Sequence, residues 1–566
     1  MSFCYGRELQ SPGTARATEY LLAGDHVYCS SSLGGNTRKY HGLLVHRNRV
    51  YLAGFDELVN GVRISPQQYT GSGEEEPALK YLKAFSLYPP QWVFMAGDAV
   101  IKKTISFNQC VTITYEVTGE AEILVRPLIT DRPVDQLLRD PRPDCEAGPY
   151  DVRWSDTFLE GSLPFTSSPA TYWNLLYREE RERGYEAVED LLSPGYFTGR
   201  IRNGTVSLCC GRINQPVHAL QYPAGPCSAL QWLDWASEAF CHRDEIYAGY
   251  HWFCESWGRD SCVSVTGLLI ERDRKEQAQG VLRHLYRNMK RGVIPNRFPD
   301  NYQTSDASLW FVYAAGRYRR RWGEDSFVAE IRPVIAEILQ DYPRSPVATL
   351  DGPLITVRPG TTWMDTQFTP RAGKPVEINA LWINALNEAE SMGIIPPVSV
   401  ESARSAFQVF WNEEAQCLYD CIDPFDASIR PNQIFALALG FIDRPRSDAA
   451  LATVRNLLFT PYGLRTLSPG DPKYRGVFDG DSSYHNGCVW PWLTGWFCEA
   501  LIRHGVEKQR VAPLLSPVIS HIREAGAGYI SEIFDGDFPY RPRGCIAQAW
   551  SVAEIARACR MVFVAP

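Results

Sequence analysis

One aspartate stands where a carboxyl group is suited to give up a proton. Asp365 follows Trp363 and Met364 in a loop rich in glycine and threonine, ahead of a run with helical spacing. Apolar neighbours withdraw water from a carboxyl group, which raises its pKa and makes it a better proton donor. The Trp363 indole also offers a flat face for a sugar ring. We therefore predict a general acid at Asp365, although such an aspartate in isolation more often only caps a turn.

Cleavage of a glycosidic bond usually needs a second carboxylate, which acts in its ionised form. Glu532 is the best candidate, because it lies with Ser531 in a glycine-bounded loop ahead of the last predicted helix. Spacing along a chain does not give the separation of two carboxylates, so the sequence leaves inversion and retention open. The rivals for the second role are Asp535, Asp537, Glu377 and Asp306.

Several loops between predicted helices combine an aromatic residue, a glycine and a charged or amide side chain. Each is weak alone, since Arg259 and Asp260 can form a local ion pair and Asp306 can be only a helix cap. Their recurrence at one position in a helical array favours a shared site, because sugars need polar groups for hydroxyls and aromatic faces for C–H surfaces. The predicted substrate contacts are Trp257, Arg259, Asp260, Asp306, Trp310, Trp363, Glu377, Arg430, His485 and Trp490.

The elements that must position these side chains fall into two regions. Residues 1–230 contain short alternating or β-branched runs between turn signals, a pattern typical of a β-sandwich. Residues 231–566 show helical periodicity in about a dozen segments, among them 488–504, 508–524 and 545–561. An open solenoid would show a sequence repeat, and we find none in this chain. We therefore predict a closed barrel of helical hairpins, whose alternate loops meet at one end.

Composition argues against several other functions. The net charge is −8 and no Lys/Arg run suggests a phosphate track, so we predict no nucleic-acid partner. The sequence has no phosphate-binding loop, no dinucleotide-binding turn and no serine nucleophile elbow. No group of histidines and cysteines has the spacing of a zinc site. We therefore predict an enzyme that needs neither metal nor cofactor.

The sequence also carries expectations about location. The first residues include Arg7 and Glu8 without an apolar core, unlike a signal peptide. No apolar run approaches the ~18 residues that cross a membrane. We expect a cytoplasmic protein that has no membrane partner and keeps its 16 cysteines as reduced thiols.

These motifs resemble those of the archaeal and bacterial amylo-α-1,6-glucosidase type of glycogen debranching enzyme, which is related to the glucosidase half of the eukaryotic enzyme. Residues 35–44, Gly-Asn-Thr-Arg-Lys-Tyr-His-Gly-Leu-Leu, resemble the signature of its N-terminal β domain. Barrel motifs in matching order lie at residues 257–260, 306–310, 362–365, 376–382, 430–433, 462–467 and 484–492.

The resemblance implies an α+β multidomain fold with an N-terminal β-sandwich followed by a glucoamylase-like (α/α)6 barrel. It implies an inverting, exo-acting hydrolase that removes single α-1,6-linked glucose residues from glycogen, limit dextrin or another branched α-glucan. It places the general acid on Asp365 and the general base on Glu532. By likeness to glucoamylase, Arg259 and Asp260 hold the hydroxyls of the non-reducing glucose.

Two alternatives remain open at this point. One is a glucoamylase-type α-glucosidase that acts on α-1,4-linked ends, and the other is a glucan-binding protein without catalysis. Asn486 stands where many members of the family have glutamine, from which we expect only local tuning. The sequence predicts neither the oligomeric state nor whether a glucanotransferase activity accompanies the glucosidase.

Overall fold

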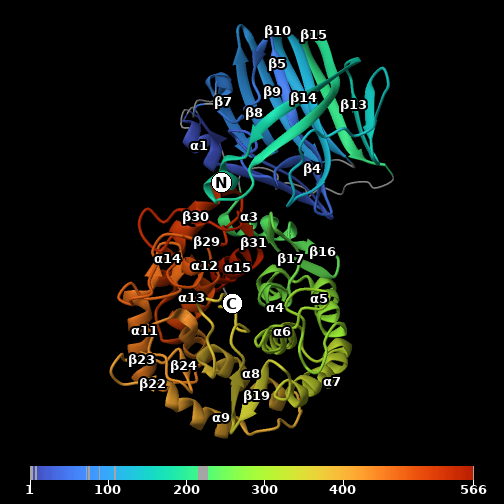
Figure 1. The fold of residues 1–566 in the computed structure, drawn as a ribbon. Coiled ribbons are helices and arrows are strands. Elements are labelled where there is room, and N and C mark those ends of the chain that lie inside the picture. The colour runs from blue at the N-terminus through green and yellow to red at the C-terminus, as the bar shows by residue number, and fades with distance from the viewer. Residues whose placement is uncertain are drawn as a thin grey trace. The chain divides into compact units, whose positions relative to one another are not determined.

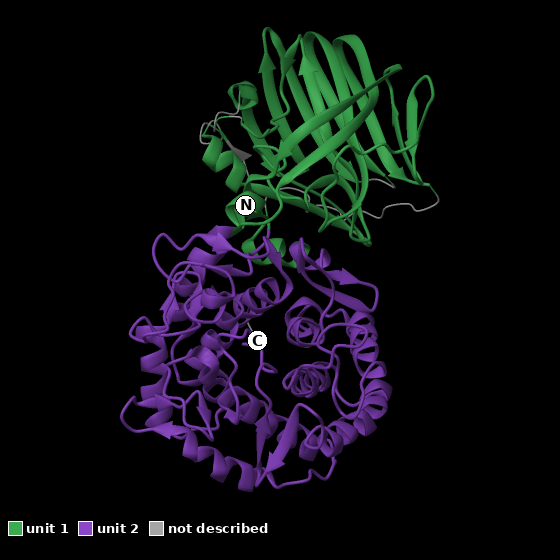
Figure 2. Ribbon diagram, in the orientation of Figure 1, with its two compact units in different colours: residues 1–235, 522–528 green, residues 236–521, 529–566 purple. Residues whose placement is uncertain are grey.

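The computed structural model describes residues 4–6, 9, 11–71, 73, 77–87, 89–107, 110–213 and 227–564. Arg7 and Glu8, on which the prediction about the amino terminus depends, lie outside this set. The chain divides into two compact units (Figure 2). Unit 1 comprises Met1–Trp235 and Ile522–Gly528, and unit 2 comprises Ala236–His521 and Tyr529–Pro566.

Unit 1 is built on one large, mainly antiparallel sheet (Figure 1). Its longest strands, β10 (Val111–Pro133) and β15 (Val188–Arg212), pair with each other. Buried and exposed positions alternate along β10, as expected of a strand with one face in a core. The sheet-rich N-terminal region predicted from the sequence is therefore confirmed. The other strands along the path through the sheet are β1 (Cys4–Tyr5), β7 (Leu82–Leu87), β8 (Pro90–Ala96), β9 (Ala99–Phe107), β5 (Arg49–Val59), β4 (Gly42–His46), β3 (Val27–Ser32), β2 (Glu19–Gly24) and β28 (Gly526–Ala527).

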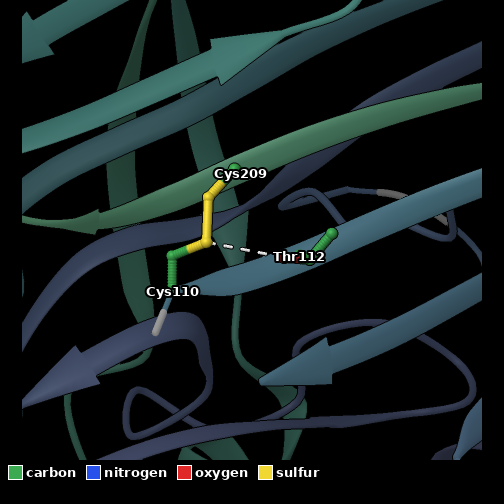
Figure 3. Close-up of a disulfide and its surroundings, with 3 residues drawn as sticks. All are labelled: Cys110, Thr112 and Cys209. Carbon is green, nitrogen blue, oxygen red and sulfur yellow. Dashed lines mark hydrogen bonds between the residues drawn. A yellow bond between two sulfur atoms is a disulfide. The ribbon is translucent and has the colours of Figure 1, made fainter. Parts of the chain in front are cut away.

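One pair of cysteines in unit 1 contradicts the prediction of reduced thiols throughout. Cys110 and Cys209 form a disulfide, with their Cα atoms 6.1 Å apart (Figure 3). Cys110 directly precedes β10, and Cys209 lies in β15 opposite Thr112 of β10. The pairing of these strands brings two cysteines that are 99 residues apart into bridging range. Sequence spacing carries no sign of this, because it depends on strand register.

Unit 2 contains a closed ring of helices, in which each ring helix packs against the next and the last packs against the first. In ring order these are α4 (Gly258–Leu268), α6 (Ala307–Trp322), α8 (Val376–Ser391), α10 (Ile434–Leu439), α13 (Leu493–Arg503) and α15 (Ala549–Phe563). Between successive ring helices the chain forms a second helix. These connecting helices are α5 (Lys275–Arg287), α7 (Ser326–Asp341), α9 (Val400–Phe407), α11 (Arg446–Leu457) and α14 (Lys508–Ser520).

Burial separates the ring helices from the connecting helices. Every residue of α4 is buried, whereas α7 buries mainly Phe327, Val328, Ile331, Ile335 and Ile338 on one face. Such an i, i+4 stripe belongs to a helix with one face in the core. Close approach between ring helices needs small residues: a Cβ on Gly267 of α4 would come within 2.1 Å of the Ala553 carbonyl oxygen of α15. No helix in the described part of the chain is long and apolar enough to cross a membrane.

Short strands tie the loops of unit 2 together, where the sequence predicts only helices. The predicted helix 488–504 begins at Leu493, because Val489 and Trp490 form β27. The predicted helix 545–561 begins at Ala549, because Ala547–Gln548 is β31. Pairing between distant loops decides these segments, and local periodicity does not record it. The strands paired with β27 form a sheet of β25 (Phe459–Thr460), β26 (Gly463–Arg465), β27, β29 (Ile533–Phe534) and β30 (Pro542–Arg543).

Candidate active site

The predicted site residues gather where the ring helices begin. Arg259 and Asp260 lie in the first turn of α4, and Glu377 lies in the first turn of α8. Asp306 occupies the N-cap position of α6. The remaining predicted residues lie in or next to the segments that lead into the later ring helices: Trp363 and Asp365 before α8, Arg430 before α10, His485 and Trp490 before α13, and Glu532 before α15.

Hydrogen bonds join the beginnings of α4, α6 and α8. The Arg259 Nε donates to both carboxylate oxygens of Asp306, at 2.8 and 2.7 Å. The Ser305 amide, just before α6, donates to the Thr361 carbonyl oxygen at 2.7 Å, in the loop that carries Asp365. Arg259 reaches the same loop, since its Nη2 donates to the Thr362 carbonyl oxygen at 3.1 Å. The acid-bearing loop is therefore held by two ring helices.

The next contacts continue around the ring. The Trp363 indole Nε1 donates to Asn432 Oδ1 at 2.8 Å, which joins the Asp365 loop to the segment before α10. Arg430 in that segment donates through Nη1 to the His485 carbonyl oxygen at 2.6 Å and through Nη2 to Asn486 Oδ1 at 2.9 Å. Asn486 therefore serves as a partner of Arg430.

Two further contacts close the circle. The Tyr484 hydroxyl, ahead of α13, donates a short hydrogen bond to Glu532 Oε1, ahead of α15. Gln548 Nε2, at the N-cap of α15, donates to Asp260 Oδ1 of α4 at 3.3 Å. Each ring helix is thus linked at its beginning to the next, and the carboxylates predicted to do chemistry belong to this circle.

Asp365 has the environment expected of a proton donor. Its side chain is 36% exposed, and Arg259 Nη1 donates to its Oδ2 at 3.3 Å. Burial of the surrounding site raises the pKa of Asp365, the Arg259 guanidinium lowers it, and the nearby Asp306 carboxylate raises it. The raised pKa prevails because burial outweighs the single contact from the Arg259 guanidinium at 3.3 Å.

Glu532 lies in a more enclosed environment. It is buried, and it accepts hydrogen bonds from the Tyr484 hydroxyl and from the Cys545 amide, the latter at 2.8 Å to Oε2. Each of its two carboxyl oxygens thus accepts a hydrogen bond. Gly544, with φ of +68°, lets the chain pass over Glu532, since a Cβ there would come within 2.2 Å of Oε2. The two carboxyl groups therefore differ in exposure and in their hydrogen-bond partners.

Asp260 links the two carboxylates electrostatically. Burial raises its pKa to about 7, the Arg259 guanidinium opposes that rise, and the charges of Glu532 and Asp365 reinforce it. Because Asp260 responds to both charges, all three carboxyl groups belong to one cluster. At neutral pH Asp260 is divided between its acid and its carboxylate forms, so it can donate as well as accept a hydrogen bond.

The predicted site residue Glu377 lies in a buried ion network behind the acid-bearing loop. Arg371 Nη2 donates to Glu377 Oε2 at 2.7 Å, and Arg371 Nε donates to Asp420 Oδ2 at 2.6 Å. Asp420 also accepts from Asn432, at 2.7 Å. Glu377 is 1% exposed, so the structure places it in the support of the Asp365 loop, and its contact with substrate stays a prediction.

The other rivals for the role of base are also engaged elsewhere. Both oxygens of Asp306 accept from Arg259 Nε. Asp535 accepts from the Arg543 guanidinium and from the Phe478 amide, and Asp537 accepts from the Tyr474 hydroxyl.

The predicted aromatic contacts divide into two groups. Trp363 is buried, and the rings of His485, Trp490 and Trp492 approach it edge to face at 5.3–5.4 Å. Burial and nearby arginines hold the pKa of His485 well below its usual value, so this imidazole is neutral. These rings form a rigid wall beside the Asp365 loop.

The other two tryptophans have different surroundings. Trp310 packs against Trp496 and Phe435 within the ring of helices. Trp257 lies under the Arg297 guanidinium, 5.8 Å from the ring centroid. The structure thus brings Trp363, His485 and Trp490 together and places Trp310 in the packing of the ring.

Four further residues complete the site, and none of them is among the predicted site residues: Tyr484, Gln548, Asn432 and Arg371. Tyr484 and Asn432 lie inside motifs already quoted, so their positions carried a signal but their roles did not. Gln548 and Arg371 act through partners 288 and 49 residues away, at Asp260 and Asp420. Such pairs become visible only when the ring has closed.

Comparison with known proteins gives two family models that match this chain. One, described as amylo-alpha-1,6-glucosidase, matches residues 229–557, more than half of the chain. The other, described as glycogen debranching enzyme N terminal, matches residues 27–207. A curated relative, the glycogen debranching enzyme of Saccharomyces cerevisiae, is 23% identical over 373 residues, which are 44% of this chain and 24% of the yeast protein. The match thus spans about a quarter of that relative.

Solved structures give more distant matches. The GH63 mannosylglycerate hydrolase from Thermus thermophilus in complex with Tris is 14% identical, with a TM-score of 0.46, over 58% of this chain and 99% of that one. The GH78 family rhamnosidase from a Bacillus species is 13% identical, with a TM-score of 0.43, over 83% of this chain and 47% of that one.

Proposed function

The chain belongs to the amylo-α-1,6-glucosidase family of the glycogen debranching type, and on that basis we propose that it is an exo-acting, inverting glycoside hydrolase that removes single α-1,6-linked glucose branches from glycogen or limit dextrin. Membership in a glycoside hydrolase family supports the reaction class. The bond and the polymer are the finer part of the proposal. We further infer that the ring of helices in unit 2 is an (α/α)6 barrel of the glucoamylase type. We also infer that the chain has two domains, residues 1–230 and residues 231–566.

One observation carries the proposal: Asp365, with its raised pKa, and Glu532 belong to one cluster of carboxyl groups around Asp260. Asp365 protonates the oxygen of the departing glucan chain. Glu532, whose two oxygens each accept a hydrogen bond, takes a proton from the attacking water. Inversion follows if the water enters between Glu532 and the sugar, on the face opposite Asp365.

The neighbouring groups suit the recognition of one terminal glucose. Arg259 and Asp260 sit between the two carboxylates in the network and offer donors and an acceptor for vicinal hydroxyls. Trp363, His485 and Trp490 are buried and support the acid-bearing loop, to which Trp363 itself belongs. A neutral His485 adds no charge that would disturb the proton on Asp365.

The test is to incubate the protein with a limit dextrin that carries single-glucose branches and to follow released glucose by proton NMR. We expect β-glucose as the first product. Initial α-glucose would overturn the inverting mechanism, and a preference for maltosyl over isomaltosyl ends would favour an α-1,4-glucosidase. Absence of any product with intact binding would favour a glucan-binding protein without catalysis.

Variants test the two roles separately. Asp365→Asn removes the proton donor and Glu532→Gln removes the base, so each is expected to abolish hydrolysis while glucan binding persists. The matched control is Asp537→Asn, because Asp537 lies in the same loop as Glu532 but accepts from Tyr474. Activity in Glu532→Gln together with loss in Asp537→Asn would reassign the base. A branched α-glucan as partner and a cytoplasmic location stay predictions.

A further inference from the structure

Unit 1 contains a cavity that the proposed reaction does not use. Its volume is about 100 Å³, and it is partly open to solvent. The lining comes from residues 20–191 of the sheet and its loops, whereas the catalytic carboxylates belong to unit 2.

A charged pair lies on the wall of this cavity. Lys103 of β9 contacts both carboxylate oxygens of Glu57 of β5, at 2.8 and 2.9 Å, and the side chains are 12% and 4% exposed. The Tyr115 hydroxyl donates a short hydrogen bond to Glu57. A buried ion pair of this kind rarely stabilises a fold more than apolar residues of similar size. Its position on a cavity wall therefore points to a function in binding.

The wall also offers an apolar face and further polar atoms. The Lys103 ammonium lies 5.5 Å from the centroid of the Trp92 ring, and Phe55 and Phe94 line the same space. Asn36 also lines the cavity, and its side chain accepts a hydrogen bond from Ser31 and donates one to the Ala53 carbonyl oxygen. Aromatic rings beside amides, hydroxyls and paired charges are the surroundings in which a sugar ring binds.

The glycine-rich motif at residues 35–44 builds one side of this wall. Gly35 has φ of +94°, and a Cβ there would come within 2.5 Å of the Pro66 carbonyl oxygen. The close approach of this turn to the loop at Pro66 therefore requires glycine. Both Gly35 and Pro66 line the cavity. Arg38 of the same motif instead donates to Glu19, at 2.9–3.0 Å. The motif thus shapes the cavity and presents Asn36 to it.

We propose that this cavity is a second carbohydrate site, which binds a neutral polyhydroxy ligand of the size of one sugar residue. The charge on the wall selects this class: Glu57 repels an anion and Lys103 repels a cation, while a hydroxyl donates to the first and accepts from the second. An ammonium carries three donors, of which the Glu57 carboxylate engages two. This proposal rests on unit 1 alone and does not depend on the reaction assigned to unit 2.

Two substitutions remove the site in different ways. Lys103→Met removes the donor, with Lys102→Met as its matched control, since Lys102 is the adjacent residue of β9 and pairs with Glu116 at the surface. Gly54→Val fills the space, because a Cβ on Gly54 meets only Asn36 Nδ2, at 3.8 Å, and valine suits a β-strand. Gly54→Val keeps every charge, so it decides the question if Lys103→Met does not fold.

Crystals of the full chain are soaked in D-glucose to locate the sugar. Glucose binding in solution is followed by saturation-transfer NMR. We expect a sugar ring in the cavity of the wild type and of Lys102→Met. In Gly54→Val and Lys103→Met we expect the occupancy of the cavity by glucose to be at least tenfold lower. Hydrolysis of limit dextrin by Gly54→Val is expected to stay at the wild-type rate, which separates this site from the proposed active site. A cavity that holds only water at saturating glucose, or equal occupancy in Gly54→Val, would overturn the proposal.

Discussion

Replacing Asp260 by asparagine is expected to stabilise the protein relative to wild type, by an amount that increases as the pH rises. In the folded chain burial raises the pKa of Asp260 to about 7 from an ordinary value of 3.8. Between these two values the unfolded chain has lost the proton while the folded chain keeps it, so the unfolded state binds fewer protons. The free energy of unfolding therefore falls as the pH rises from about 4 to about 7. Asparagine has no proton to lose and escapes this loss.

The magnitude follows from the size of the pKa shift. The shift amounts to about 3 pKa units at about 1.4 kcal/mol each, so the full effect is on the order of 4 kcal/mol. In a unit of this size a change of 1 kcal/mol moves the melting temperature by roughly 1 to 2 °C. The difference in melting temperature between Asp260→Asn and wild type should thus grow by about 4 to 8 °C between pH 4 and pH 8.

The assay is thermal unfolding of both proteins at a fixed scan rate over that pH range. The dependence on pH is the diagnostic quantity, since asparagine also changes stability by an amount independent of pH. The contact with Gln548 survives, because an asparagine amide also accepts a hydrogen bond. A difference that stays flat with pH would show that Asp260 is ionised throughout, and the electrostatic account of the cluster would be refuted.

Three further predictions concern the support of the site. Tyr484→Phe removes the hydroxyl that holds Glu532 Oε1, so kcat should fall by about 10- to 100-fold in glucose-release kinetics, and an unchanged kcat would contradict this role. Arg371→Met leaves two buried carboxylates without their partner and should cost about 3–5 kcal/mol in denaturant unfolding, with little recovery in Arg371→Lys because lysine lacks the planar fork. Gly267→Ala should destabilise by about 1–3 kcal/mol, although alanine favours helices, because its Cβ meets the Ala553 carbonyl oxygen; a gain in melting temperature would contradict this packing.

Much of the site was predictable from sequence because it lies in local motifs. Asp365 and Trp363 stand within three residues of each other, and the segments leading into the ring helices share a composition that marks them as a set. The structure brings these segments together in one circle of hydrogen bonds. What they share in sequence is therefore position at a helix beginning, which periodicity and turn signals record.

The remainder depends on pairing between distant segments. Glu377 lies at a helix beginning, where the sequence predicts a substrate contact. In the structure Arg371 donates to Glu377 and also to Asp420, which lies 49 residues further along the chain than Arg371. The Cys110–Cys209 disulfide follows from the register of β10 and β15. Trp310 belongs to a motif but lies among other rings inside unit 2. In each case the competing partner stands far along the chain, where composition and spacing give no signal.

The closure of the ring between α4 and α15 has a consequence for how the chain is made. Asp260 accepts a hydrogen bond from Gln548, which lies 288 residues later in the chain. The circle of hydrogen bonds is therefore complete only when the last ring helix has folded against the first. During synthesis on the ribosome, the groups around Asp365 are exposed without Glu532, and no partial chain that ends before residue 532 holds both. The residues of the proposed active site therefore come together in one late step. Shortened chains that end before α15 are expected to expose the apolar sides of α4 and α13 to chaperones and proteases.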